Sequence, residues 1–389
     1  MMRVTVPTRM IRWAIDRSDV PEEHLHGRFR KLAEWIAGSH RPTLKQLQDF
    51  AKATHTPFGY FFLHEPPQEQ VPIPDFRTIA DEPIARPSPN LLDTIYLCQQ
   101  RQEWYREYAR SVGEAPVKLI GSARRSDDVA STAERIRAAL GFNLDQRRRM
   151  RTWTEALRSF VEQADNLGIL AMVSGIVGSN THRPLDPDEF RGFALADPLA
   201  PLVFVNGADT KAAQMFTLAH ELAHLWLGES GLSDASARAT PDQPVERWCN
   251  QVAAELLVPL DAVRQAHRPG ESLQDEMSRL ARQFKVSTLV VLRRLHDAGY
   301  LTRKQLWDAY DAEVQRLQGL PRGKGGDYYL TTPARVSRRF ARAVVTAAWE
   351  GRASFTEALR LLGCRKIATL RELGQSVGAD IGRSVGADI

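Results

Sequence analysis

The stretch FTLAHELAH at residues 216–224 carries the strongest signal for fold and chemistry in this chain. It is mostly apolar, and His220 and His224 are four residues apart. On a helix this spacing places both imidazoles on one face, where they can bind one metal ion. Glu221 follows the first histidine and can accept a proton from a water beside that metal. The motif therefore predicts a catalytic zinc site on a buried helix.

The flanking residues predict where this helix lies. It should begin near Thr210, continue through Trp226 and end at Gly228. Two short apolar segments before it, 168–173 and 201–206, are typical of buried strands, and we expect loops between them. The second segment could be an edge strand that pairs with an extended peptide, or a buried structural strand. Strands followed by the motif helix predict an α+β fold that is mostly helical, with a small sheet.

The third metal ligand is expected on a second helix, over residues 245–258. A catalytic zinc site has three protein ligands and one open position. Glu246 and Asn250 are four residues apart, so Glu246 could bind zinc while Asn250 holds a ligand histidine in place. Glu255 lies among apolar residues, where an ionised carboxylate needs a partner or a metal. We prefer Glu246 as the ligand and keep Glu255 as the alternative, or as a residue supporting the site.

The three cysteines, Cys98, Cys249 and Cys364, form no CxxC pair. So sparse a set indicates reduced thiols in the cytoplasm rather than a disulfide framework. Cys249 could be a soft metal ligand, but it falls on a different helix face from Glu246. We expect neither a signal peptide nor a membrane-spanning segment. The net charge of +5 is too small to argue for nucleic-acid binding by itself.

With 389 residues the chain should hold two or three domains. Helical spacings at 10–17, 22–37 and 44–52, with Thr43 as an expected N-cap, precede a proline-rich run. The last residues repeat the hexapeptide SVGADI. We expect the following parts: a helical domain 1–66, a linker 67–89, a helical domain 90–165, a zinc metallopeptidase core 166–300, a C-terminal helical domain 301–375 and a tail 376–389.

Other charged or histidine-bearing segments have plainer interpretations. The arginines at 147–149 and 151 form a basic cluster that is more typical of a solvated helix face than of a nucleic-acid site. A helix-turn-helix-like pair at 280–296 is expected to be structural. His182, His267 and His296 are isolated, and we expect them at the surface.

These motifs together resemble the ImmA/IrrE family of metallopeptidases. The resemblance rests on FTLAHELAH, on Glu246 with Asn250, and on AAELLVP at 253–259. Segments 74–78, 190–194 and 325–329 are similar to longer members. The resemblance implies a gluzincin-like zincin core flanked by helical domains, with His220, His224 and Glu246 as Zn²⁺ ligands, and so favours Glu246 over Glu255. It also implies an endopeptidase that inactivates a repressor, often one encoded nearby.

Longer members of that family begin with a helix-turn-helix, and residues 42–47 and 57–63 resemble the end of such a unit. The segment in the recognition-helix position, 29–36, is largely apolar, although Arg28, Arg30 and Lys31 could contact phosphates. The first domain could therefore bind DNA, or could be a degenerate helical domain that docks to proteins. The alternative to a peptidase is a DNA-binding regulator with a structural or vestigial zinc site. The oligomeric state stays open.

Overall fold

The computed structural model describes residues 2–18, 20–76, 86–233, 243–318 and 333–379. Contacts between Cα atoms divide the chain into two units. Unit 1 comprises Met1–Pro72 and Pro83–Ile95, and unit 2 comprises Ile73–Glu82 and Tyr96–Ile389. A short segment before residue 83 thus belongs to unit 2 although it lies between two pieces of unit 1. Most of the expected domain 90–165, the core 166–300 and the domain 301–375 fall together in unit 2.

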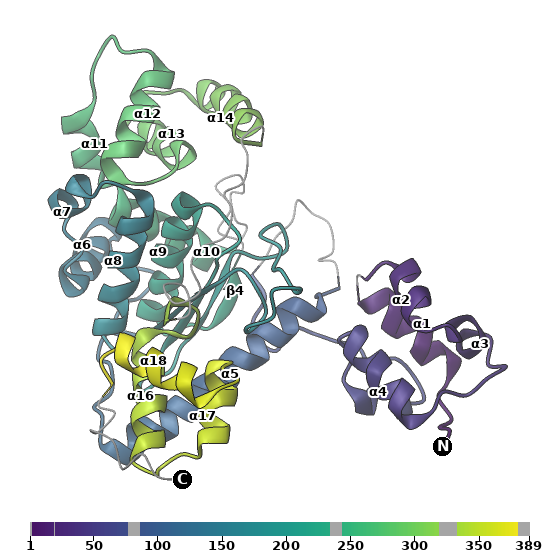
Figure 1. The fold of residues 1–389 in the computed structure, drawn as a ribbon. Helices are drawn as coiled ribbons and strands as arrows, with labels where there is room; N and C mark the ends of the chain where they lie inside the picture. The colour runs from purple at the N-terminus through teal and green to yellow at the C-terminus, as the bar shows by residue number, and fades with distance from the viewer. Residues whose placement is uncertain (1, 19, 77–85, 234–242, 319–332, 380–389) are drawn as a thin grey trace. The chain divides into compact units, whose positions relative to one another are not determined.

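Unit 1 is helical (Figure 1), and its core is rich in aromatic side chains. Its elements are α1 (Thr8–Arg17), α2 (Glu22–Arg28), α3 (Leu32–Ile36), α4 (Leu44–Ala53) and the 3₁₀ helix η1 (Phe58–Phe62). The ring of Phe50 on α4 contacts Phe29, Trp35 and Phe61 at centroid distances of 5.4–6.0 Å. The helix expected over 22–37 is interrupted after Arg28, where Phe29 leaves helical geometry and places its ring in this core.

Thr43 begins α4 as predicted. Its hydroxyl accepts a hydrogen bond from the Gln46 backbone N–H at 3.2 Å, and the Gln46 side chain accepts one from the Thr43 N–H at 2.9 Å. This reciprocal pair satisfies two backbone donors that the first turn of a helix leaves without partners. The prediction of a cap at Thr43 is confirmed.

Two parts of the expected linker, before residue 73 and from residue 86 onward, pack onto unit 1. The guanidinium of Arg17 donates to both carboxylate oxygens of Glu69, at 2.6 and 2.8 Å, and to the His55 carbonyl at 2.8 Å. Both charged side chains of this pair are buried, so each offsets the cost of burying the other. Further along, the guanidinium of Arg86 lies 5.3 Å from the centre of the Trp13 ring.

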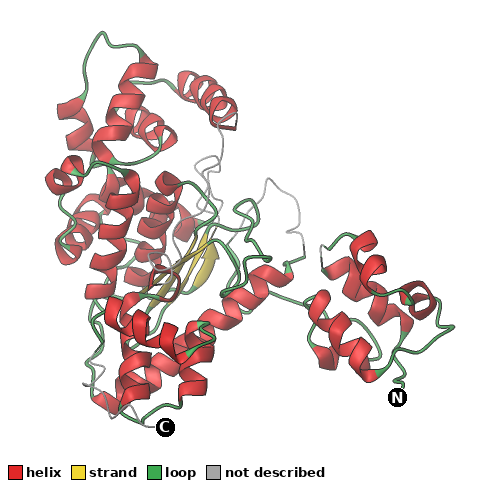
Figure 2. Cartoon of the chain, viewed as in Figure 1, coloured by secondary structure: helices red, strands yellow, loops and turns green. Residues whose placement is uncertain are grey.

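Unit 2 surrounds a small sheet with helices (Figure 2). Its helices are α5 (Pro89–Val112), which begins in unit 1, α6 (Val129–Leu140), α7 (Leu144–Arg149), α8 (Trp153–Asn166), α9 (Lys211–Leu227), α10 (Pro244–Leu257), α11 (Leu260–Ala266), α12 (Leu273–Phe284), α13 (Thr288–Asp297), α14 (Arg303–Gln318), α16 (Arg338–Trp349), α17 (Phe355–Leu362) and α18 (Ile367–Ser376). Over the described residues, none of the helices is both long and apolar enough to span a membrane.

Among the described residues the sheet has four strands: β1 (Leu170–Ser174), β2 (Gly192–Leu195), β3 (Leu202–Asn206) and β4 (Gly231–Ser233). Their order is β1-β3-β2-β4. β3 runs parallel to β1, and β2 runs antiparallel to both β3 and β4. The hypothesis that β3 is an edge strand for peptide binding is therefore wrong, because β3 lies between two strands. The mostly helical α+β fold is confirmed.

Side chains on the two faces of the sheet differ in size. Small residues, Ala171, Ala194 and Val203, share a core with the helices α8 and α9. The neighbouring residues on each strand, Met172, Phe193 and Phe204, are in register with one another and point to the opposite face. The small face allows α9, which carries the histidines, to pack closely against β2 and β3.

A buried carboxyl group, that of Asp165, connects the C-terminal helix α16 with the sheet strand β1. Asp165, near the end of α8, accepts hydrogen bonds from the Ser337 hydroxyl at 2.6 Å and from the Arg338 and Ala171 backbone N–H groups at 3.0 and 3.3 Å. Ser337 is itself the N-cap of α16. Burial raises the pKa of Asp165 from 3.8 to about 6, although these hydrogen bonds oppose the rise.

This pKa predicts a pH-dependent stability. A carboxyl whose pKa is higher in the folded state stabilises the fold at low pH, and that contribution is lost as the pH rises from about 4 to about 6. The free energy of unfolding should fall over this range by roughly 3 kcal/mol more in the natural chain than in Asp165→Asn. Urea unfolding at several pH values measures the difference. Glu162→Gln, on the same helix, is the control, and equal pH profiles for Asp165→Asn and the natural chain would refute the prediction.

Candidate metal centre

The helix α9 presents its histidines from inside the core. It begins after Thr210, whose hydroxyl accepts a hydrogen bond from the Ala213 N–H at 3.2 Å, and it ends at Gly228, whose φ of 74° is left-handed. Both limits match the predicted helix. His220, Glu221 and His224 have no solvent exposure.

The helix α10 packs against α9 and supplies the carboxylate. Pro244 occupies its first turn, where a missing N–H costs no hydrogen bond. Glu246 also lies in that first turn, and its negative charge is stabilised by the positive end of the helix dipole. One turn later, Asn250 lies on the same side of the helix.

Three side-chain groups converge between these helices. Glu246 Oε1 lies 2.9 Å from His224 Nε2, Glu246 Oε2 lies 3.2 Å from His220 Nε2, and the two Nε2 atoms are 3.1 Å apart. Tetrahedral zinc with bonds of 2.0–2.1 Å holds its ligand atoms about 3.3 Å from one another. His220, His224 and Glu246 therefore fit a zinc ion, in ligand type and in spacing.

Asn250 fixes the orientation of one histidine. Its Oδ1 lies 2.9 Å from His220 Nδ1. An amide oxygen only accepts hydrogen bonds, so Nδ1 carries the proton and donates it. When His220 loses its Nε2 proton, the lone pair of Nε2 is directed toward Glu246 and His224, which is the tautomer that a metal ligand requires.

Burial and nearby charges shift the pKa values of His220, His224 and Glu246 in different directions. Burial opposes ionisation of Glu246. The charge of His220 and the hydrogen bonds that Glu246 accepts from His220 and His224 outweigh this effect and hold the pKa of Glu246 at about 2. Burial lowers the pKa of His224 and so favours its neutral form. Burial also acts against the charged form of His220, but the negative charge of Glu246 leaves the pKa of His220 above its usual value. The group thus contains an ionised carboxylate and a neutral imidazole, both suited to a cation.

Glu221 lies beside the group with its carboxylate oxygens unused. Neither oxygen has a hydrogen-bond partner of normal geometry among the described residues. Burial raises the pKa of Glu221 to about 8, and the charge of Glu246 adds to the rise, while His220 and the Ser233 hydroxyl oppose it. Space for this side chain comes from Gly192 on β2, because a Cβ there would lie 2.9 Å from Glu221 Oε1.

Glu255 does not join the metal group. Its carboxylate pairs with Arg294 on α13 and accepts a hydrogen bond from the Leu260 N–H at 3.3 Å. The expectation that Glu255 binds or supports the metal is therefore not met, because an arginine neutralises its charge at the opposite end of α10. Cys249 is buried in the apolar core and lies outside the metal group.

Three arginines bind the carbonyl groups at the C-terminal end of α10. Arg137 donates to the carbonyls of residues 255 and 256, Arg147 to that of Leu257, and Arg294 to that of Val258. Such carbonyls have no partner within the helix and carry partial negative charge. The expectation that the basic cluster is a solvated face is wrong for Arg147, which is fully buried, whereas Arg148 and Arg149 are exposed.

The residues expected to contact DNA belong to unit 1 and take no part in this group. Arg28, Arg30 and Lys31 are exposed around the turn between α2 and α3. Lys31 Nζ lies 3.6 Å from a Glu34 carboxylate oxygen. The helix at the recognition position, α3, has only five residues, and its Leu32 and Trp35 are buried. The second helix pair forms as α12 and α13, with Arg294 buried rather than exposed.

Three residues near the metal group were not expected from the sequence. Gly192 makes room for Glu221, and the Ser233 hydroxyl lies 3.3 Å from His224 Nε2. The ring of Phe76 stacks on the His224 imidazole, with centroids 5.7 Å apart and planes 7° from parallel. Gly192 and Phe76 lie in segments noted for their family resemblance, which was the only sequence signal for them.

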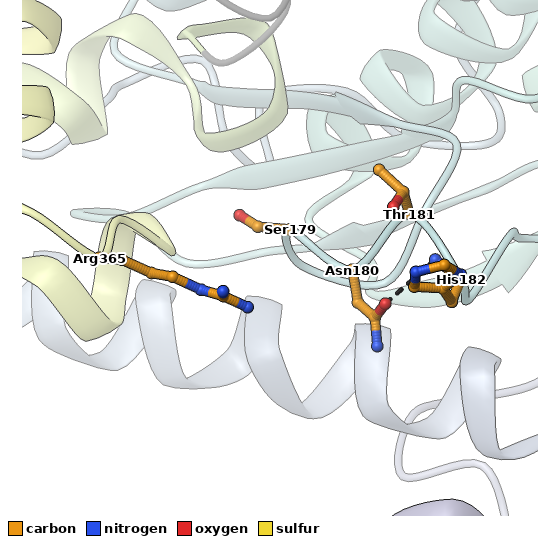
Figure 3. Close-up of a pocket in the computed structure, with 5 residues that line it drawn as sticks. All are labelled: Ser179, Asn180, Thr181, His182 and Arg365. Atoms are coloured by element: carbon orange, nitrogen blue, oxygen red, sulfur yellow. Dashed lines mark hydrogen bonds between the residues drawn. The ribbon is translucent and has the colours of Figure 1, made fainter.

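A separate surface hollow of about 450 Å³ contains none of the metal-group residues (Figure 3). It is lined by Ser179, Asn180, Thr181, His182 and Arg365. All five are exposed, and the His182 backbone N–H donates to Asn180 Oδ1 at 3.0 Å. His182 thus lies at the surface as expected. His267 is not an isolated surface residue, because its Nδ1 lies 3.0 Å from Glu276 Oε1 and its ring stacks on Tyr300.

Comparison with known protein families agrees with this geometry. Residues 164–296 match the model of the IrrE N-terminal-like domain of the peptidase family M78. This range contains both histidines, Glu221, Glu246 and Asn250. Residues 336–376, which include α16 to α18, match a domain of unknown function, DUF8813. A search of curated proteins gives no match. The chain therefore carries a domain of a metallopeptidase family, and the resemblance to the ImmA/IrrE family is confirmed over this range.

Substitution of the two glutamates of α10 distinguishes their roles. Purified Glu246→Ala should lose stoichiometric zinc, because two histidines alone leave the ion with too few protein ligands. Glu255→Ala should retain one zinc per folded chain, although loss of the partner of Arg294 should lower its stability. Metal content is measured by elemental analysis of the folded protein. A full complement of zinc in Glu246→Ala would exclude Glu246 as a required ligand.

Proposed function

We propose that the IrrE N-terminal-like domain of this chain is a zinc-dependent endopeptidase that cleaves and inactivates a DNA-binding repressor. The observation that carries the proposal is the buried group His220, His224 and Glu246, with Glu221 beside it, whose carboxylate oxygens have no hydrogen-bond partner of normal geometry among the described residues. A purely structural zinc site does not require an additional carboxylate that binds no metal, and burial of such a group without a good partner costs free energy. Glu221 therefore favours catalysis over a structural or vestigial site.

The residues of the chain have distinct parts in the proposed reaction. His220, His224 and Glu246 would hold a zinc ion, which would supply the Lewis acidity that makes water more acidic and polarises a carbonyl. Glu221 accepts the proton of the attacking water and returns a proton to the amine that leaves. Asn250 keeps the His220 ring in the orientation that a ligand needs, through the hydrogen bond to Nδ1.

The surroundings of Glu221 support this assignment. Apolar residues of α9, such as Leu218 and Leu222, are fully buried. An apolar and dry environment strengthens each electrostatic contact and excludes bulk water from the reacting groups.

The choice of a repressor as substrate rests on the resemblance to the ImmA/IrrE family. A protein substrate has to be recognised by surfaces outside the metal group, and unit 1 is a separate helical body that can supply one. A gene for a repressor next to the gene for this chain would identify the candidate substrate.

The function is tested with Glu221→Gln. This change keeps the shape of the side chain but removes the proton acceptor, so zinc should stay bound while cleavage falls by about 10²–10⁴-fold. Cleavage of purified candidate repressors is followed by gel electrophoresis and mass spectrometry. Glu134→Gln, at an exposed position of α6, is the matched control and should cleave at the normal rate. Undiminished cleavage by Glu221→Gln would remove Glu221 from the mechanism.

DNA binding by unit 1 is a second candidate function. It is favoured by the exposure of Arg28, Arg30 and Lys31 on one turn. The gel shift of promoter DNA, measured across salt concentrations, should weaken in the triple alanine variant. The slope of the logarithm of the binding constant against the logarithm of salt concentration should become shallower by about one for each phosphate that the variant no longer neutralises. Absence of any shift by the natural chain at low salt would exclude this function.

A further inference from the structure

The segment Pro74–Phe76 pairs with β4, the last strand of the sheet, through an isolated β-bridge beside the metal group, and we refer to this segment as the outer strand. The Leu232 N–H donates to the Pro74 carbonyl at 2.8 Å, and the Phe76 N–H donates to the Leu232 carbonyl at 2.9 Å. Asp75 thereby forms a parallel bridge to Leu232 at the centre of β4. The backbone of this segment, far from α9 in sequence, is fixed at the edge of the sheet next to the motif helix.

This strand places an aromatic ring on a metal-ligand histidine. The Phe76 ring is nearly parallel to the His224 imidazole, at a centroid distance of 5.7 Å. Room for the ring depends on Gly231, because a Cβ at that position would lie 2.2 Å from Phe76 Cε2. The φ of Gly231 is not positive, so backbone conformation does not explain the glycine. The close approach of Phe76 does.

The two histidines are held in different ways. His220 Nδ1 is fixed by Asn250, whereas His224 Nδ1 is buried without a hydrogen-bond partner among the described residues. A ligand imidazole normally has its second nitrogen bound to a carbonyl or carboxylate, which sets the plane of the ring. For His224, the plane is instead restricted by the flat contact with Phe76.

We propose that Phe76 is a positioning residue of the metal centre, which orients His224 by stacking as Asn250 orients His220 by hydrogen bonding. The inference rests on the proposed zinc-dependent function. It extends the metal centre to a segment that precedes the IrrE N-terminal-like domain, because residues 74–76 lie outside the matched range 164–296. The outer strand holds the backbone of Phe76, and Gly231 admits its ring.

The proposal is tested by zinc affinity in the full chain, measured by competition with a chromophoric chelator. Phe76→Ala should bind zinc about tenfold more weakly, as expected for loss of a group that orients a ligand. Phe76→Leu, which keeps apolar bulk without a ring, should also be weakened, and Phe76→Tyr should bind nearly as the natural chain does. The visible spectrum of the cobalt-substituted protein reports the geometry of the metal ligands. It should change in Phe76→Ala, because His224 is no longer held in its orientation. Phe355→Ala, at a partly exposed position of α17, is the control.

A double-substitution cycle separates positioning from general stability. Gly231→Ala should weaken zinc binding in the natural chain, because its methyl group displaces the Phe76 ring, but should have little further effect in Phe76→Ala. Equal zinc affinity and unchanged cobalt spectra in Phe76→Ala and Phe76→Leu would overturn the proposal. So would additive effects in the cycle, or faster cleavage by Phe76→Ala at unchanged affinity. Failure of the natural chain to bind zinc would instead refute the proposed function itself.

Discussion

The burial of four polar side chains in an apolar core is the constraint on which the rest of unit 2 depends. His220, Glu221 and His224 are completely buried, and Glu246 is nearly so. Each such group costs several kcal/mol when it is removed from water without a partner. Their convergence makes three of them partners of one another and able to share a cation, and this requires that α9 and α10 keep one relative position.

The far end of α10 shows how that position is maintained. Guanidinium groups from α6, α7 and α13 bind the last carbonyls of the helix, so its C-terminal end is fixed by charge as well as by packing. The first turn of the same helix presents Glu246 to the histidines. Basic residues at the far end of α10 thereby help to hold in place the helix that carries Glu246, and one of them, Arg294, also pairs with Glu255.

Much of the site could be predicted because its signals are local. The caps of α9 and the four-residue spacing of the histidines lie within one short stretch, and helix geometry converts that spacing into a shared face. Helical periodicity could not decide between Glu246 and Glu255, since the answer depends on which end of α10 faces α9. The strands β2 and β4 were missed because they are three or four residues long and buried on both faces, so they show no alternation. Contacts such as Phe76 with His224 join distant segments and leave no periodic signal.

The path of the chain around the sheet has a practical consequence for the expression of the IrrE N-terminal-like domain by itself. A fragment trimmed to residues 164–296, the range that the family model defines, would keep every metal-binding side chain. It would lack Arg137 and Arg147, which bind the end of α10, and it would lack the outer strand on β4. A fragment that keeps these contacts therefore has to be longer than the range of the family match, and it should begin before residue 73.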